Sequence, residues 1–168
     1  MIRGRIVTTA VALLIGATAT TVAGGASGAG RQPRGEIELA GYFHQAAWPG
    51  TVTITTSSDG QRVYRISGDL PGVCRDKRTG RLLRAGRDGA ISMLFDASPN
   101  ALIHADGTFS FTAKVSAASG LAPHTLTVRG TFYGNNVLGR ASGRSTTAKY
   151  ERYSSCSGDQ PFWAKRIG

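Results

Sequence analysis

Hydrophobic and polar residues alternate along most of the chain after residue 36. In 108–115 (TFSFTAKV) the apolar side chains fall on every second position, and 125–133 (TLTVRGTFY) repeats the pattern. The segments 51–57 and 91–95 alternate in the same way. A period of two with one polar face is typical of strands in antiparallel sheets that are half exposed to water. Four residues are predicted to face the core: Phe109, Phe111, Val128 and Phe132.

Turn-forming residues separate these segments. Asp-Gly pairs lie at 59–60, 88–89 and 106–107, and Gly134 is followed by two asparagines. These residues adopt positive φ at low cost, as tight hairpins require. No stretch after residue 36 has a helical period. Together the segments and turns predict an all-β fold, either an antiparallel β-sandwich or a closed β-barrel, of about eight or nine short strands.

The first 29 residues have the layout of a secretory signal peptide. Arg3 and Arg5 precede an apolar run over 6–22, and small residues that suit cleavage follow it. The alternative is an uncleaved membrane anchor, but the run is short for a hydrocarbon core of about 30 Å and is interrupted by threonines. We therefore expect a secreted, extracellular protein that has no membrane span after cleavage.

Cleavage would leave a basic protein with one domain. The expected parts are a signal peptide over 1–29, a flexible leader over 30–35 and a single domain over 36–168, which is long enough for one hydrophobic core. The whole chain has 20 Lys plus Arg against 10 Asp plus Glu, a net charge of +10. Removing the two arginines of the signal peptide leaves 18 against 10, a net charge of +8.

The chain has two cysteines, Cys74 and Cys156. In an exported protein a disulfide between them would persist, and it would close a loop of about 83 residues, worth up to about 4.5 kcal/mol in the chain-entropy model. The alternative is two thiols, one of them nucleophilic, but that chemistry requires a histidine partner and no signature supplies one. We predict the disulfide, with Cys156 just before the final strand, because terminal strands open easily unless they are held.

Four motifs occur in order along the chain: Gly41-Tyr42-Phe43, DGTFSF at 106–111, VRGTFYGNNVLGRASG at 128–143 and CSGDQPFWAKR at 156–166. With the mid-chain cysteine, this order resembles a family of small secreted bacterial β-sandwich proteins whose activity is uncharacterised. The resemblance spans nearly the whole mature chain. It implies the fold and an exported compartment, and it implies no catalytic residue.

The sequence contains no signature of a common catalytic site. A nucleophile elbow, a phosphate-binding loop, a zinc-protease motif and a Cys-x-x-Cys pair are all absent. His44, His104 and His124 lie on different predicted segments, so we expect them at the surface or in turns rather than around a zinc ion. Glu36 and Glu38 suit a solvated edge better than an acid–base pair. We expect no enzymatic activity, no cofactor and no metal.

Positive charge concentrates in 75–87 (RDKRTGRLLRAGR), where six cations accompany a single aspartate. A long loop or protruding hairpin of this kind can bind nucleic acid, an acidic cell-wall polymer or an anionic membrane surface through its charge. The segment has no aromatic residue for base stacking, and the chain has no specific nucleic-acid motif. The alternative is a solvated loop of a basic protein. The candidate polyanion-binding residues are Arg75, Lys77, Arg78, Arg81, Arg84 and Arg87.

Three functional hypotheses remain open from the sequence. The first is a secreted binding or interaction module whose partner is unknown. The second is a module that binds an anionic polymer or the cell-envelope surface through 75–87. The third is a secreted protease inhibitor or an enzyme. An inhibitor would present a rigid exposed loop, and Lys77-Arg78 close to Cys74 would be a suitable bait in such a loop for a trypsin-like protease. The sequence favours binding over catalysis.

Overall fold

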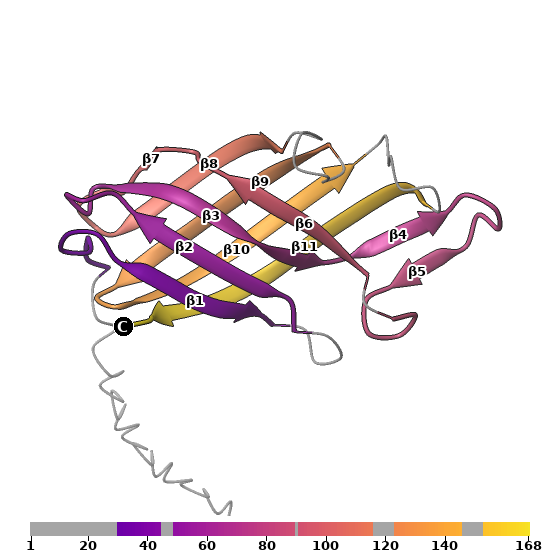
Figure 1. The fold of residues 1–168 in the computed structure, drawn as a ribbon, viewed down its shortest axis with the longest axis horizontal. Coiled ribbons are helices and arrows are strands. Elements are labelled where there is room, and N and C mark those ends of the chain that lie inside the picture. The colour runs from indigo at the N-terminus through magenta and orange to yellow at the C-terminus, as the bar shows by residue number, and fades with distance from the viewer. Residues whose placement is uncertain (1–29, 45–48, 90, 116–122, 146–152) are drawn as a thin grey trace, which may run out of the picture.

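The chain forms a single antiparallel sheet that curls into a nearly closed barrel (Figure 1). The computed structural model describes residues 30–44, 49–89, 91–115, 123–145 and 153–168, which contain eleven strands and no helix. The all-β prediction is therefore confirmed. The strands are β1 (Glu38–Phe43), β2 (Thr51–Thr56), β3 (Arg62–Pro71), β4 (Val73–Asp76), β5 (Leu82–Arg84), β6 (Ser92–Ala97), β7 (Ala101–Leu102), β8 (Thr108–Val115), β9 (His124–Tyr133), β10 (Asn136–Ser145) and β11 (Tyr153–Arg166).

Eight of these strands build the wall of the barrel. Their order is β6-β3-β2-β1-β11-β10-β9-β8, so the first strand pairs with the last and brings the two ends of the domain together. The strands β6 and β8 end this order and contact each other without ladder hydrogen bonds between the described residues. The short strand β7 pairs with β3 and also contacts β8. The gap between β6 and β8 is therefore a seam.

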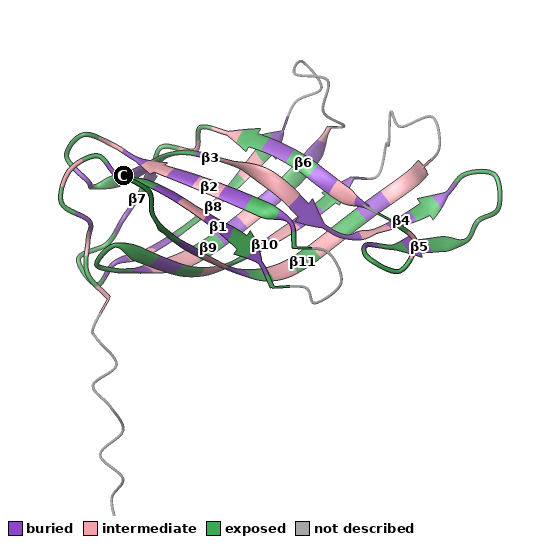
Figure 2. Cartoon of the chain, turned by 60° about the horizontal axis from the view of Figure 1, so that its bottom comes forward, coloured by how far each residue is buried: buried purple, intermediate pink, exposed green. Residues whose placement is uncertain are grey.

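The inner faces of the strands fill the barrel with apolar side chains. Figure 2 shows buried and exposed residues alternating along the strands, as the period of two predicts. Phe109, Val128 and Phe132 are buried as expected, whereas Phe111 faces the core but is only partly buried. The rings of Phe109 and Phe132 lie 5.5 Å apart in a tilted arrangement, a favourable aromatic geometry.

Two glycines make room for these rings in the barrel wall. Gly130 on β9 lies opposite Gly139 on β10. A Cβ atom added at Gly130 would lie 2.8 Å from the ring of Phe109, and one added at Gly139 would lie 2.3 Å from the ring of Phe162. The rings of Phe109 and Phe162 therefore pack directly against the backbone of these glycines. A residue with a side chain at position 130 or 139 would displace the ring.

The structure differs from the sequence prediction in two details. It has eleven strands rather than eight or nine, because 73–84 forms a hairpin of its own and β7 is only two residues long. Cys156 lies within β11 and not before it, because β11 starts at Tyr153 and continues past the cysteine to pair with both β4 and β10. A terminal strand of fourteen residues can be held at both of its ends.

The N-terminal part of the chain is described only from residue 30. The predicted signal peptide, 1–29, lies outside the described residues. In the expected leader, 30–35, the backbone N–H of Arg31 donates to the carbonyl of Phe132 at 2.9 Å, and Pro33 is buried. No helix within the described ranges is long and apolar enough to cross a membrane.

Candidate functional site: a basic hairpin and a polar trough

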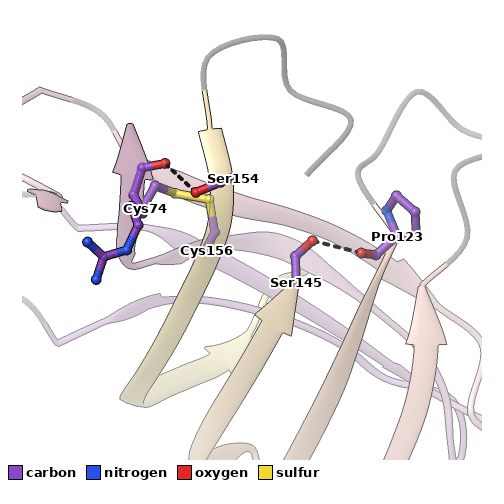
Figure 3. Close-up of a disulfide and its surroundings, with 6 residues drawn as sticks. Cys74, Pro123, Ser145, Ser154 and Cys156 are labelled. Carbon is purple, nitrogen blue, oxygen red and sulfur yellow. Dashed lines mark hydrogen bonds between the residues drawn. A yellow bond between two sulfur atoms is a disulfide. The ribbon is translucent and has the colours of Figure 1, made fainter. Parts of the chain in front are cut away.

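The predicted disulfide between Cys74 and Cys156 is present (Figure 3). The two cysteines lie directly opposite each other on the neighbouring antiparallel strands β4 and β11, with 4.1 Å between their Cα atoms. Next to the bond, the hydroxyl of Ser154 donates to the carbonyl of Arg75 at 3.4 Å. A buried disulfide is consistent with an extracellular protein, because the cytoplasm keeps thiols reduced.

The candidate residues of 75–87 are brought together by strands β4 and β5, which project beyond one end of the barrel (Figure 1). We call residues 73–87 the basic hairpin. On its inner side Leu83 lies opposite Cys74, and both side chains are buried in the core cluster. The disulfide and this apolar contact therefore fix the base of the hairpin to the barrel.

The turn of the basic hairpin is organised by the buried carboxylate of Asp76. Its Oδ1 accepts hydrogen bonds from the backbone N–H of Arg78 at 3.0 Å and of Thr79 at 2.8 Å, and from the Thr79 hydroxyl at 3.0 Å. This arrangement is an Asx turn. Gly80 follows with a φ of 66°, which glycine adopts without steric cost. The single aspartate of the basic segment thus shapes the hairpin.

Two of the six cations have partners inside the hairpin or beside it. Nη1 of Arg75 donates to the carbonyl of Gly80 at 2.7 Å, and Nη2 of Arg81 lies 2.8 Å from Oδ1 of Asp88. Asp88 also accepts the backbone N–H of Arg84 through Oδ2 at 2.8 Å. Four exposed side chains make no hydrogen bond or ion pair with any other described residue: Lys77, Arg78, Arg84 and Arg87.

The histidines do not form a site in the part of the chain that the structure describes. His44 and His104 are exposed as expected, whereas the expectation of a surface or turn position is wrong for His124, which is buried at the start of β9. No group of three or more His, Cys, Asp or Glu side chains among the described residues could hold a metal ion.

A second feature, which the sequence analysis did not find, is a polar trough on the outer face of β9, β10, β11 and the start of β4. Its widest part has a volume of about 760 Å³. Seven of its lining residues have polar side chains: Thr125, Thr127, Ser142, Arg144, Ser157, Asp159 and Gln160. We call this hollow and its continuation the polar trough.

The polar trough continues along the strands. A hollow of about 240 Å³ shares Thr127, Ser142 and Asp159 with the widest part and adds Arg129 and Arg140. A third hollow, of about 360 Å³, shares these two arginines and reaches Leu138. The outward residues of β10 along this path are 144, 142, 140 and 138, so the trough extends over about 20 Å at the rise of an antiparallel strand.

One ion pair crosses the polar trough. Nε of Arg140 lies 2.6 Å from Oδ1 of Asp159, and Nη2 lies 3.0 Å from Oδ2, in a bidentate arrangement. The hydrogen bonds from Arg140 lower the pKa of Asp159, and the positive charges of Arg140 and Arg129 lower it further, whereas partial burial opposes the shift. Asp159 is therefore a carboxylate at neutral pH.

A scan against protein-family models and a search of curated proteins found no match to the chain. We therefore interpret the basic hairpin and the polar trough from their own geometry and chemistry. The sequence holds one signal for the trough that could have been used. In 125–131 and 140–144, the outward positions of the alternating pattern carry serine, threonine and arginine. Only the register of four strands shows that these side chains meet.

Proposed function

We propose that the protein is an exported binding module, not an enzyme, and that it holds an anionic polymer through the basic hairpin. One observation carries the proposal: four cations without partners among the described residues stand on a hairpin that projects from the barrel. Lys77, Arg78, Arg84 and Arg87 lie within eleven residues of sequence and belong to the basic hairpin. Charges of one sign held this closely attract a polyanion and raise its rate of association.

The fixed shape of the hairpin supports this role. The disulfide, the contact between Cys74 and Leu83 and the turn around Asp76 hold the backbone, so binding would immobilise mainly the four long side chains. Less conformational entropy is then lost on binding than with a free loop. A single exposed ion pair contributes at most about 1 kcal/mol, so several cations must act together.

Export is part of the proposal. The layout of 1–29 suits a secretory signal peptide, and the disulfide is consistent with an oxidising environment outside the cytoplasm. An exported basic protein meets acidic polymers at the cell envelope, where charge alone can retain it.

The conformation of the hairpin supports polymer binding better than protease inhibition. Lys77 and Arg78 lie in the hydrogen-bonded turn around Asp76. Peptides that pair with the edge of another protein's sheet are extended. A tight turn presents its two cations to solvent but does not offer an extended backbone to a protease cleft.

Heparin affinity at several salt concentrations tests the proposal. Changing Lys77, Arg78, Arg84 and Arg87 together to serine should elute the protein at much lower salt. The slope of log affinity against log salt should fall by roughly three, as the loss of four counterion-releasing contacts predicts. The melting temperature should stay nearly unchanged, because these side chains make no contacts that hold the core.

A matched control removes four exposed cations elsewhere. Arg31, Arg34, Lys165 and Arg166 are all exposed and belong to the segment 30–35 and the C-terminal end of β11, at the opposite end of the barrel from the hairpin (Figure 1). Their change to serine alters the net charge equally. Equal losses in the two variants would show that only net charge matters and would refute a site on the hairpin.

A further inference from the structure

The outward side chains of β8, β9, β10 and β11 form rows across the strands. The first row is Lys114, Thr125, Arg144 and Ser157. The second row is Thr112, Thr127, Ser142 and Asp159. The third row is Ser110, Arg129, Arg140 and Pro161. Since successive rows are two residues apart, the two cationic rows lie about 13 Å apart, with a row of hydroxyls between them.

Two arginines of these rows, Arg129 and Arg144, are exposed and could meet a ligand. Arg129 and Arg144 make no side-chain hydrogen bond or ion pair with any residue that the structure describes, whereas Arg140 is paired with Asp159. A carboxylate has about four acceptor positions, so Asp159 can still accept hydrogen bonds from hydroxyl groups. In the middle row, Thr112 and Thr127 are linked by a hydrogen bond of 3.0 Å between their hydroxyls. The trough thus offers donors and acceptors between two sets of positive charge.

A fourth row adds an apolar platform at one end of the polar trough. On the outer face Leu138 lies opposite Trp163, which in turn lies opposite Tyr42 on β1. Leu138 and Tyr42 are more than half exposed. Exposed aromatic rings next to polar groups suit ligands that have one apolar face and several hydroxyls, as a sugar ring has. The other end of the trough is lined by Gly72 and Val73, which lead directly into the basic hairpin.

We propose that the polar trough binds a linear acidic polysaccharide, in which anionic groups alternate with hydroxyl groups, and that the chain continues onto the basic hairpin. This inference rests on the proposed polyanion-binding function and names the polymer class. Carboxylates or sulfates of the ligand meet Arg129 and Arg144, for which guanidinium groups offer paired donors. Sugar hydroxyls meet Thr127, Ser142 and Asp159.

Asp159 and the shape of the surface favour this ligand over other polyanions. The two cationic rows lie about 13 Å apart with hydroxyls between them, which suits anionic groups that are widely spaced along a polymer better than the closely spaced phosphates of a nucleic acid. Asp159, whose charge is compensated by Arg140, can accept hydrogen bonds from a sugar. The aromatic row alone would serve bases as well as sugars, so the spacing of the cationic rows and the hydroxyl row between them are decisive. A membrane surface is broad and cannot enter a trough about 20 Å long that is lined by polar groups.

The inference is tested by calorimetry, which measures the affinity of the purified full-length protein for oligogalacturonate at fixed ionic strength. Ser142→Tyr fills the trough without a change of charge and should weaken binding on the order of tenfold, a loss of about 1.4 kcal/mol. A second variant, Thr127→Val with Ser142→Ala, removes two hydroxyls and adds no bulk. It should weaken binding about fivefold or more, and it keeps the test decisive if the tyrosine variant fails to fold.

The outcomes separate this inference from the function proposed above. Loss of heparin binding in the hairpin variant, with no effect of either trough variant on oligogalacturonate, would leave the basic hairpin standing and overturn the trough. If the trough variants lose oligogalacturonate binding while the hairpin variant binds heparin as the parent does, the trough site would be supported and the hairpin site refuted. The assignment to a polysaccharide would be overturned if the protein bound a single-stranded RNA oligomer or anionic vesicles more tightly than oligogalacturonate and the trough variants abolished that binding.

Discussion

The burial of individual aromatic residues in the barrel depends on more than the alternation of polar and apolar positions. Phe132 on β9 is fully buried and packs against Phe109 on β8. Phe111, two positions after Phe109 on β8, is only partly buried. Both belong to the same alternating inner face. We attribute the difference to the seam, where β8 has no ladder partner on one side among the described residues, although Phe109 nearer the start of the same strand is buried.

Phe132→Ala should therefore destabilise the protein more than Phe111→Ala does. A fully buried phenylalanine typically costs about 3–5 kcal/mol on truncation, because both the transfer free energy and the packing around the cavity are lost. We expect a value in this range for Phe132 and a clearly smaller one for Phe111, from urea unfolding curves. Equal losses for the two variants would mean that Phe111 is as well covered as Phe132.

The ion pair in the polar trough predicts a pH dependence of stability. Arg140 lowers the pKa of Asp159 in the folded protein, so the stabilisation is present above the unfolded pKa of about 3.9 and is lost as the pH falls through the lower folded value. Asp159→Asn should be less stable than the parent at pH 6, by at most about 1 kcal/mol because the pair is exposed. The difference should shrink below pH about 4 in thermal melts. A difference that grows on acidification would contradict the assignment.

At the scale of elements, the strand β11 connects the barrel to the basic hairpin. Its C-terminal half pairs with β1, its N-terminal end pairs with β4, and β10 runs beside it along nearly its whole length. The disulfide joins β4 and β11 at the point where the hairpin leaves the barrel. The bond therefore stabilises the hairpin in addition to closing a long loop.

Replacing both cysteines with alanine should lower the free energy of unfolding by up to about 4.5 kcal/mol, the chain-entropy value for a closed loop of this length. We also expect the amides of 73–84 to lose more protection from hydrogen exchange than those of β9 and β10. Reduction of the parent with dithiothreitol should give the same changes. An unchanged denaturation midpoint in the reduced protein would show that the pairing of β4 with β11 and β5 suffices.

The sequence could predict the elements better than their arrangement. The alternation around Phe109 and Val128 identifies strands and faces, because these depend on neighbours two positions away. The pairing of Cys74 with Cys156 follows from there being only two cysteines in a chain that the sequence predicts to be exported. The cations of 75–87 are visible as a local run, but Asp76 as the organiser of their turn is not. The outward hydroxyl and arginine side chains are visible in the alternating pattern, but their meeting in a trough could not be predicted, because it depends on the register of Thr127, Ser142 and Asp159 across three strands.

At the scale of the whole molecule, the seam between β6 and β8 is the place where the barrel wall lacks a ladder of hydrogen bonds between the described residues. Unpaired strand edges can add strands from other chains, and proteins protect them by short strands, charges and prolines. Here β7 is two residues long and contacts β8 at one end of the seam, and it follows Pro99 and Asn100. Lys114 lies on β8 and is exposed. These features limit pairing along the edge without closing the barrel.

Hydrogen exchange should detect the seam directly. The strand β10 is paired on both sides, with β9 and with β11, so its amides should exchange only when the barrel unfolds. The strand β8 pairs only with β9 among the described residues, so the amides of β8 that point away from β9 should exchange orders of magnitude faster than those of β10. Measurement of both strands in one sample removes differences in temperature and pH. Uniform protection along β8, equal to that of β10, would show that the seam is bridged in solution. The barrel would then be fully closed, and the partial burial of Phe111 would need another cause.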